Sequence, residues 1–302
     1  SEMCIRDSPS TLEVSQGIAS VLYSIPSILD SPYSFVEDLR FQKLSTTTQE
    51  FDVERSIASS YLYRADTTGV GLTLGHSLAR ESIFNVPADV QLSRFDSGTV
   101  LLSSLNSSLT IDRRDAPLMP TSGYTLGFDG TLATNALGSD ASYLSGVVRG
   151  STILPLFSPI SPWSLAASTR WGAAKGLSGT DNIPITQRFY LGGRNSIRGF
   201  RENSLGPRGE LGNVIGGDIL SASSIQLQRR VAERVSLHTF IDIGNVFLRY
   251  QHPSLTDQRT GYGVGVRFLS PIGPVGFDLG FPLNPEEYEP RMRFHFSVGS
   301  NY

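Results

Sequence analysis

One stretch, RFYLGGRNSIRGFRENSLGPRG at residues 188 to 209, gathers the residue types in this chain that are best suited to chemistry. It combines arginines and five glycines with aromatic residues, and it follows neither a helical period nor a strand period. A guanidinium group forms charge-assisted pairs with carboxylates and stacks on aromatic rings, so such a stretch is suited to ionic pairing. The elements around it must supply the carboxylate and the ring.

A second charged group, DRRD at residues 112 to 115, could suggest acid–base chemistry, but a charged turn is the better interpretation. The chain lacks the Gly-x-Ser-x-Gly elbow of a hydrolase, and no Ser-His-Asp set stands out. The histidines are scattered and have no metal-ligand spacing: His76, His238, His252 and His295. We therefore predict that the protein is not an enzyme and holds neither a metal nor a cofactor.

The composition of the chain limits the classes of partner and fold that it can have. The formal net charge of −3 argues against nucleic acid as a partner, because phosphate binding leaves a basic footprint. The sole cysteine, Cys4, lies in SEMCIRDS, and we interpret residues 1–8 as a non-native scar. No run approaches the roughly 18 apolar residues of a transmembrane helix. A soluble protein and a membrane β-barrel both satisfy that observation.

Alternation with a period of two dominates the chain and is cleanest in the last third. In RFHFSV, Phe294 and Phe296 share one face while His295 lies on the other. In TFIDIGNVF, Phe240 and Asp242 fall on the polar face. Helix signals are almost absent, and about thirteen strand-sized segments follow residue 10. The pattern predicts an all-β fold.

Two architectures produce this alternation. In a soluble sandwich the apolar face packs inward, whereas in an outer-membrane barrel it meets lipid and the polar face lines the lumen. Aromatic residues near strand ends, and a last strand that ends on an aromatic residue, favour the transmembrane antiparallel β-barrel. Bacterial single-chain barrels have an even number of strands, so an odd count means either that a strand is miscounted or that the first strands are missing. The scar at the start of the sequence favours missing strands.

Four stretches, taken in order, resemble the barrel domain of the outer-membrane protein assembly superfamily, the surface antigen family of BamA- and TamA-type proteins. They are SLTIDRRDAPLMPTSGY, then FYLGGRNSIRGFRENSLGPR, then TFIDIGNVF, and finally LSPIGPVGFDLGFPLNP followed by RFHFSVGSNY. Each is a weak signal alone, but their shared order over residues 108 to 302 makes the match specific.

The resemblance assigns two motifs to residues of this chain. The turn motif of the first stretch corresponds to Asp112, Arg114, Asp115 and Gly123. The lumen-loop motif of the second stretch corresponds to Ile197, Arg198, Gly199 and Phe200. The glycines of GYGVGV are interpreted as leaving room for this inserted loop or for aromatic packing.

In that family the loop folds back into the barrel lumen, where its arginine meets a phenylalanine and an aspartate of the inner wall. The resemblance therefore implies that Arg198 contacts Phe240 and Asp242, which the alternation independently places on the polar face. Gly199 would permit the tight turn. This sequence departs from the family at Gln226, where a glutamate often faces the same arginine. Asp242 is then the one wall carboxylate that can be named, so the pair is expected to be weaker unless another acid compensates.

The resemblance also implies a domain organisation. Residues 9–302 correspond to an outer-membrane β-barrel domain with an inserted loop at residues 178–214. The family barrel has about 16 strands, so about three N-terminal strands are expected to be missing, together with the periplasmic POTRA domains that precede them. The implied location is the bacterial outer membrane.

The implied function is the assembly and insertion of β-barrel proteins by strand addition at a lateral seam. One side of that seam is expected in the closing strand at Phe294, Phe296, Gly299 and Tyr302. The implied partners are outer-membrane lipid, unfolded β-barrel client proteins, and accessory assembly lipoproteins or an inner-membrane partner. Two alternatives stay open: a two-partner secretion transporter of the same superfamily, and a passive porin-like barrel.

Overall fold

The computed structural model describes most of the chain: residues 16–26, 31–45, 51–65, 69–116, 119–158, 160–249, 257–271 and 273–298. The expected scar at residues 1–8 lies outside these described residues. Gly299 and Tyr302 of the predicted closing strand also lie outside them.

In the described residues, thirteen strands form one antiparallel sheet in which each strand pairs with its neighbours in the sequence. The all-β fold and the strand number predicted from alternation are confirmed. The strands are β1 (Gln16–Ile25), β2 (Ser34–Ser45), β3 (Asp52–Ala65), β4 (Val70–Phe84), β5 (Gly98–Asp112), β6 (Gly123–Ala133), β7 (Tyr143–Pro155), β8 (Trp163–Gly176), β9 (Ile219–Ala232), β10 (Val235–Phe247), β11 (Arg259–Ser270), β12 (Gly273–Pro282) and β13 (Arg293–Val298).

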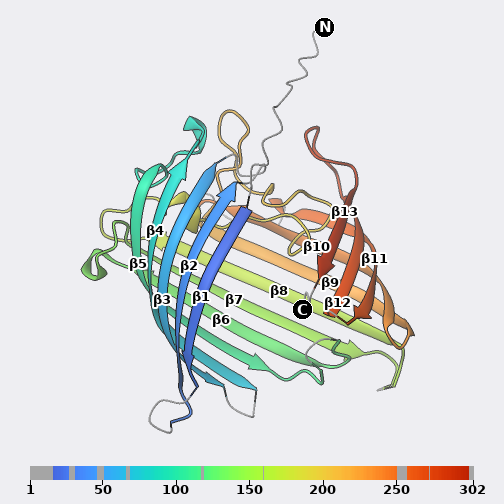
Figure 1. Ribbon diagram of the computed structural model, residues 1–302. Coiled ribbons are helices and arrows are strands. Elements are labelled where there is room, and N and C mark those ends of the chain that lie inside the picture. Colours follow the sequence, from blue (N-terminus) through green and yellow to red (C-terminus); the bar gives the residue numbers. More distant parts are fainter. Residues whose placement is uncertain are drawn as a thin grey trace.

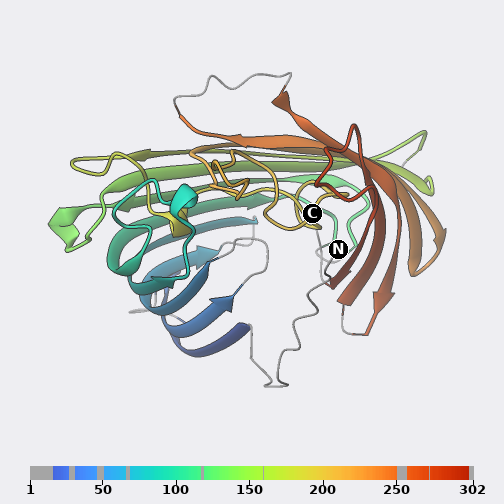
Figure 2. The same cartoon turned by 90° about the horizontal axis from the view of Figure 1, so that it is seen from above.

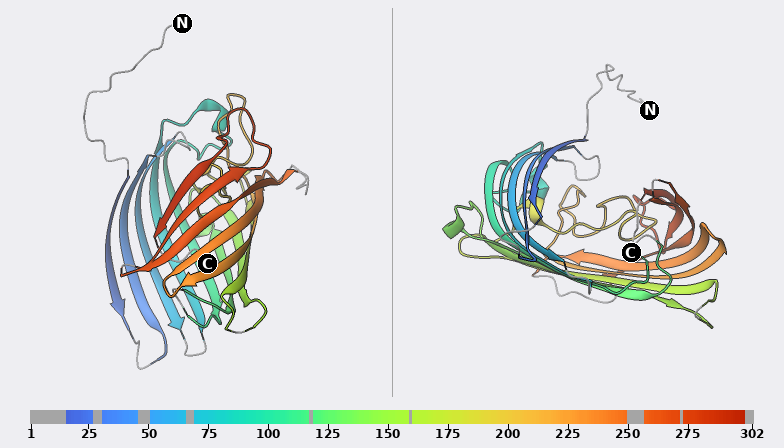
Figure 3. Two further views of the ribbon diagram at one scale, coloured as in Figure 1. Left: turned by 90° about the vertical axis from the view of Figure 1, so that its right-hand side faces the viewer. Right: turned by 60° about the horizontal axis from the view of Figure 1, so that its bottom comes forward.

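The sheet curls into the wall of a barrel, as the views in Figures 1 and 2 show. Strands β1 and β13 are its two edges, and they are not paired with each other within the described residues. Both edges border the same open side of the curved wall (Figures 2 and 3). We call this side, between β1 and β13, the seam.

The two faces of the wall differ in chemistry because side chains alternate along each strand. On β10, Ile241 and Ile243 are 53% and 43% exposed on the convex face. Phe240 and Asp242, on the concave face, are 3% and 0% exposed. Large apolar side chains are exposed in the same way along most of the other strands. An apolar outer face and a polar inner face are what a lipid-embedded barrel requires.

The long connection between β8 and β9, which contains the predicted inserted loop, runs along the concave side of the wall (Figure 2). Its apolar side chains pack against those of β9 and β10 in one buried cluster: Leu191, Ile197, Phe200, Leu205, Leu220, Ala222 and Val246. The buried core at this loop therefore lies between loop and inner wall, whereas the outer face of the wall stays free for lipid.

Short helices occur only in loops of the described residues. They are the 3-10 helices η1 (Ala88–Val90), η2 (Asn135–Leu137) and η3 (Ile185–Gln187). No helix in this part of the chain is both long enough and apolar enough to cross a membrane. Helix η1 lies in the β4–β5 loop and η3 lies at the start of the inserted loop, so both lie at the same end of the antiparallel sheet.

Candidate functional site

Arg198 and Asp242 form the centre of the site. The inserted loop carries Arg198, and β10 presents Asp242 from the concave face of the wall. The guanidinium donates from Nε to Oδ2 and from Nη2 to Oδ1, each over 2.8 Å, and the backbone N–H of Arg198 also donates to Oδ2 over 3.0 Å. The two side chains are only 5% and 0% exposed. The result is a bidentate, charge-assisted pair removed from bulk water.

Phe240 and Ser224 complete the immediate surroundings of this pair. The guanidinium carbon of Arg198 lies 3.4 Å from the centroid of the Phe240 ring, which is a cation–π contact. The Ser224 hydroxyl donates to Oδ1 of Asp242 over 2.6 Å and accepts from Nη2 of Arg198 over 3.3 Å. The structure thus brings the loop arginine together with both wall residues that the resemblance implied.

A second wall carboxylate, Asp278 of β12, lies beside the same guanidinium. Its Oδ2 is 3.6 Å from Nη1 of Arg198, and its Oδ1 is 2.6 Å from Nε2 of His238. Sequence reasoning did not name Asp278 as a partner. The available signal was its position on the polar face of GPVGFDLGFPL, but alternation does not say which strands face the loop. Asp278 is therefore a second acid beside Arg198, as expected if another carboxylate compensates for the glutamate that Gln226 replaces.

Gln226 of β9 lies on the concave face but contacts other groups. Its Nε2 donates to the hydroxyl of Ser224 over 3.4 Å, and its Oε1 accepts from Nη2 of Arg267 over 3.3 Å. Among the described residues it is therefore linked to Arg198 only indirectly, through Ser224.

Glycines on the wall make room for the loop backbone. Gly199 has a φ of +97°, in the left-handed region that favours glycine. A Cβ on Gly261 of β11 would lie 1.9 Å from the carbonyl oxygen of Arg198, and one on Gly280 of β12 would lie 2.5 Å from the nitrogen of Gly199. The strand glycines are thus the surface against which the loop docks.

The same loop contacts β13, the last strand. The N–H of Gly199 donates to Nε2 of His295 over 3.1 Å, and Nη1 of Arg194 donates to the carbonyl oxygen of Phe296 over 3.0 Å. The side chains of Phe294 and Phe296 point to the other face, at 61% and 47% exposure. Two hydrogen bonds therefore join the inserted loop to a strand that borders the seam.

A second buried ion pair, which sequence reasoning missed, holds the base of the inserted loop. Nη2 of Arg188 pairs with Oδ2 of Asp96, and the side chains are 1% and 0% exposed. Asp96 also accepts from the N–H groups of Leu92, Ser93 and Ile185. These bonds tie the β4–β5 loop to the inserted loop. Arg188 belongs to the arginine-rich stretch, but no motif marks Asp96 in the sequence.

The predicted turn motif lies in the connection between β5 and β6. Arg114 donates from Nε and Nη2 to the two carboxylate oxygens of Asp112, over 2.9 and 2.6 Å. Asp115 accepts from the N–H and the hydroxyl of Thr121, and Gly123 has a φ of +109°. Partial burial raises the pKa of Asp115, but these hydrogen bonds outweigh it and hold the pKa below its usual range. The charges form a structural turn.

A curved antiparallel sheet with an apolar outer face, and with an arginine loop docked on its inner face, defines a membrane β-barrel domain. The sequence matches the profile of the Omp85 superfamily domain over residues 12–302, and the chain belongs to this superfamily. The family predicted from the motifs is thereby confirmed.

Curated relatives include assembly factors from bacteria and animals. The outer membrane protein assembly factor BamA of Neisseria meningitidis serogroup B is 28% identical over 224 residues, which are 63% of this chain and 28% of the relative. The sorting and assembly machinery component 50 homolog A of Xenopus laevis is 32% identical over 197 residues, which are 65% of this chain and 39% of the relative. The chain thus spans well under half of either relative.

Two solved structures share the fold. BamA from Haemophilus ducreyi lacking POTRA domains 1–3 superimposes with a TM-score of 0.82 at 20% identity, over 95% of this chain and 62% of the other. CdiB from Acinetobacter baumannii superimposes with a TM-score of 0.57 at 15% identity, over 94% of this chain and 50% of the other. At these identities the likeness concerns the fold alone.

Proposed function

We propose that this chain is the barrel domain of a factor that assembles β-barrel proteins and inserts them into an outer membrane. Two relatives carry that role in their names, as an outer membrane protein assembly factor and as a component of a sorting and assembly machinery. The structural observation that carries the proposal is the double attachment of the inserted loop. Arg198 fastens the loop to the inner wall, while Arg194 and Gly199 fasten it to the last strand.

The proposed mechanism begins at the seam. An edge strand exposes unpaired backbone N–H and C=O groups, and an extended client segment adds to such an edge as a further strand. In the described residues β13, the last strand, is an edge strand of the sheet. The free energy for insertion comes from backbone hydrogen bonding and from burial of the client's apolar face in lipid. Such a mechanism does not require a nucleotide.

The loop would couple the lumen to the seam. Arg194 donates to a backbone carbonyl of β13, so movement of this strand has to break that bond or carry the loop along. The buried pair of Arg198 and Asp242 resists such loop movement, because separating two buried charges leaves each without compensation. We infer that the loop holds the last strand in one position until a client strand competes for it.

The proposed location and partners follow from the same relatives. The bacterial BamA relatives support the bacterial outer membrane as the location, although relatives named as sorting and assembly machinery come from animals. We thus propose an outer membrane as the location in general, and the bacterial outer membrane as the more specific location. The proposed partners are membrane lipid and unfolded β-barrel clients, with accessory assembly lipoproteins or an inner-membrane protein as further candidates.

A polypeptide transporter of the same superfamily is the second candidate function. CdiB shares the fold at a TM-score of 0.57, against 0.82 for BamA, so the fold alone leaves the transporter open. The curated relatives at 28% and 32% identity favour assembly over transport. A passive porin has less support, because nothing in conduction calls for the loop's bonds to the last strand.

The test is the substitution Arg198→Ala in the protein expressed at full length. It should leave the barrel inserted but release the loop, because Asp242 loses its charge-assisted partner. A strain that is depleted of its own copy and expresses this variant should then fail to assemble its outer-membrane proteins. The folded fraction of those proteins in the membrane measures the effect.

The matched control is Arg201→Ala, which removes an exposed arginine from the same loop. It should support growth and assembly at the level of the unsubstituted protein. Full complementation by the Arg198→Ala protein would end the proposed role of the loop. If that variant instead stopped export of one soluble polypeptide while barrel assembly continued, the transporter would replace the assembly factor.

A further inference from the structure

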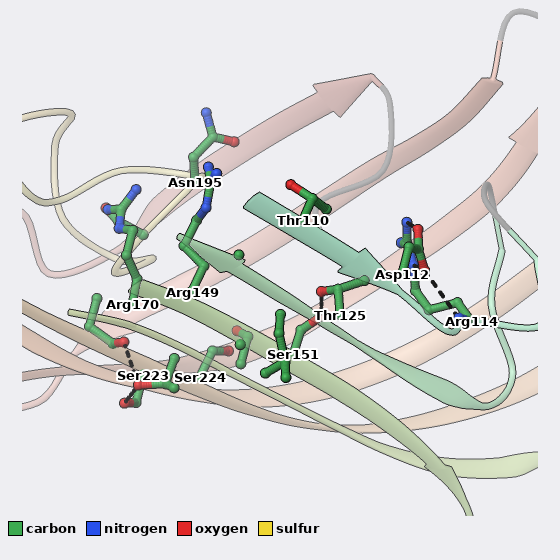
Figure 4. A pocket seen from close by; sticks show the side chains of 17 residues that line it. Thr110, Asp112, Arg114, Thr125, Arg149, Ser151, Arg170, Asn195, Ser223 and Ser224 are labelled. Carbon is green, nitrogen blue, oxygen red and sulfur yellow. Dashed lines mark hydrogen bonds and ion pairs between the residues drawn. The ribbon is translucent and has the colours of Figure 1, made fainter. Parts of the chain in front are cut away.

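Strands β5 to β9 carry a second feature on the concave face, a cavity of about 350 Å³ that the Arg198 pair does not fill. Two arginines of the sheet, Arg149 of β7 and Arg170 of β8, line it beside the Asp112–Arg114 pair, and residues Asn195 and Ser196 of the inserted loop cover it. Figure 4 shows both guanidinium ends pointing toward the space beside Asn195. The cavity is therefore walled by the sheet and roofed by the loop.

The two arginines are direct cross-strand partners, since Arg149 pairs with Arg170 in the register of β7 and β8. Like charges directly opposite each other destabilise a sheet. Their neighbours in the same row are Gly127 on β6 and Ala222 on β9, whose short side chains neither screen the charges nor fill the space. The wall thus concentrates positive charge at one level and leaves it accessible.

The two charges are only partly compensated. Arg149 forms an ion pair with Asp129 over 2.5 Å, and that pair is half exposed. Arg170 forms no hydrogen bond or ion pair with any residue that the structure describes. The nearby carboxylate Asp112 already accepts hydrogen bonds from Nε and Nη2 of Arg114. One positive charge in the cavity therefore has no protein partner among the described residues.

Neutral donors complete the cavity. The side-chain amide of Asn195 makes no hydrogen bond within the described part of the chain and borders the cavity. Ser168 and Ser151 border it from β8 and β7, and the Ser151 hydroxyl lies 2.7 Å from that of Thr125. Guanidinium, amide and hydroxyl groups that converge from wall and roof suit an acceptor with oxygens in several directions.

We propose that this cavity is a binding site for a phosphate group. Two oxygens of a tetrahedral phosphate can accept hydrogen bonds from the planar guanidinium of Arg170, while its remaining oxygens face Arg149 and Asn195. The same chemistry is offered by a free phosphate ion and by the phosphate of a lipid headgroup. The site faces the lumen, so a headgroup would have to enter from the inside of the wall.

The test uses the whole chain, folded in detergent micelles at low ionic strength. Isothermal titration with inorganic phosphate should show one site, and Arg170→Ala should weaken its affinity about tenfold or more, as loss of a charge-assisted bond implies. Arg149→Ala should weaken it less, because that guanidinium is shared with Asp129. The control Arg40→Ala removes a wall arginine paired with Asp38, and it should leave phosphate affinity unchanged.

A loop variant guards against failure of the wall variants to fold. Asn195→Ala leaves every strand intact and should weaken phosphate binding a few-fold. Competition with glycerophosphoethanolamine separates the sources: displacement of phosphate assigns the site to a headgroup, and its absence assigns the site to the free ion. No heat of binding at about 10 mM phosphate, or equal affinity in the unsubstituted and Arg170→Ala proteins, would overturn the proposal.

Discussion

At the scale of single residues, the organising group is the guanidinium of Arg198. It satisfies Asp242 through two side-chain hydrogen bonds, stacks on Phe240 and lies 3.6 Å from Asp278. Burying these charges is costly in itself, so the cluster is expected to contribute specificity of loop position more than net stability. The full free-energy penalty of burial appears only when one partner is removed and the other charge stays buried without compensation.

Asp242→Asn should therefore destabilise the folded protein strongly. We expect a loss of about 3–5 kcal/mol in the free energy of unfolding, because a buried guanidinium is left without its main countercharge. The matched change, Asp129→Asn, removes a wall aspartate whose pair with Arg149 is half exposed, and such pairs contribute about 0–1 kcal/mol. Equilibrium unfolding in urea measures both. Similar losses for the two variants would show that burial of the Arg198 pair has no energetic consequence.

At the scale of elements, strands β11 and β12 are shaped by what docks against them. Their glycines weaken them as strands, since glycine adds no packing and costs backbone entropy. In exchange, the loop backbone at Arg198 and Gly199 approaches the wall more closely than any side chain would allow. The inserted loop therefore acts as a part of the wall, with its own buried cluster and its own ion pairs.

Gly261→Ala should displace the inserted loop. Its Cβ would lie 1.9 Å from the carbonyl oxygen of Arg198, and overpacking of this kind costs about 1–3 kcal/mol. Trypsin should then cleave the arginines of the loop about tenfold faster, because cleavage follows the population of the undocked state. The control is Gly150→Ala on β7, where the nearest atom would be a Leu126 side-chain carbon at an ordinary 3.5 Å. Equal cleavage rates would contradict the docking argument.

At the scale of the whole molecule, one curved sheet separates two environments. The convex face presents mostly apolar side chains, and the buried ionic clusters lie on the concave face. The seam between β1 and β13 is where this separation is interrupted in the described residues. The polar concave face therefore lies next to an edge strand, while the apolar convex face is available to lipid.

Two adjacent positions on β7 test the orientation of the wall. Val148 is 55% exposed on the convex face, and Val148→Arg should cost about 2–4 kcal/mol if that face meets the middle of a bilayer. Val147 lies on the concave face opposite Asp129, so Val147→Arg should be tolerated. Unfolding measured in phospholipid vesicles gives both values. A larger cost at position 147 than at 148 would reverse the proposed faces.

Alternation and motifs determined a large part of this picture. A period of two predicts which face of a strand each side chain occupies, and so Phe240 and Asp242 could be placed on the inner face from the sequence. The number of strands followed from the same signal, because turn residues separate the alternating runs. The arginine-rich stretch stood out by composition, and family resemblance supplied its partners on the wall.

Only the tertiary structure decided which groups meet across long sequence distances. Asp278 and His295 join the Arg198 cluster, Asp96 pairs with Arg188, and Arg149 lies opposite Arg170. Alternation assigns a side chain to a face but leaves the register between strands, and the path of a loop across them, undetermined. These depend on packing and on charge pairing between segments about 20 to 100 residues apart, which no local pattern encodes.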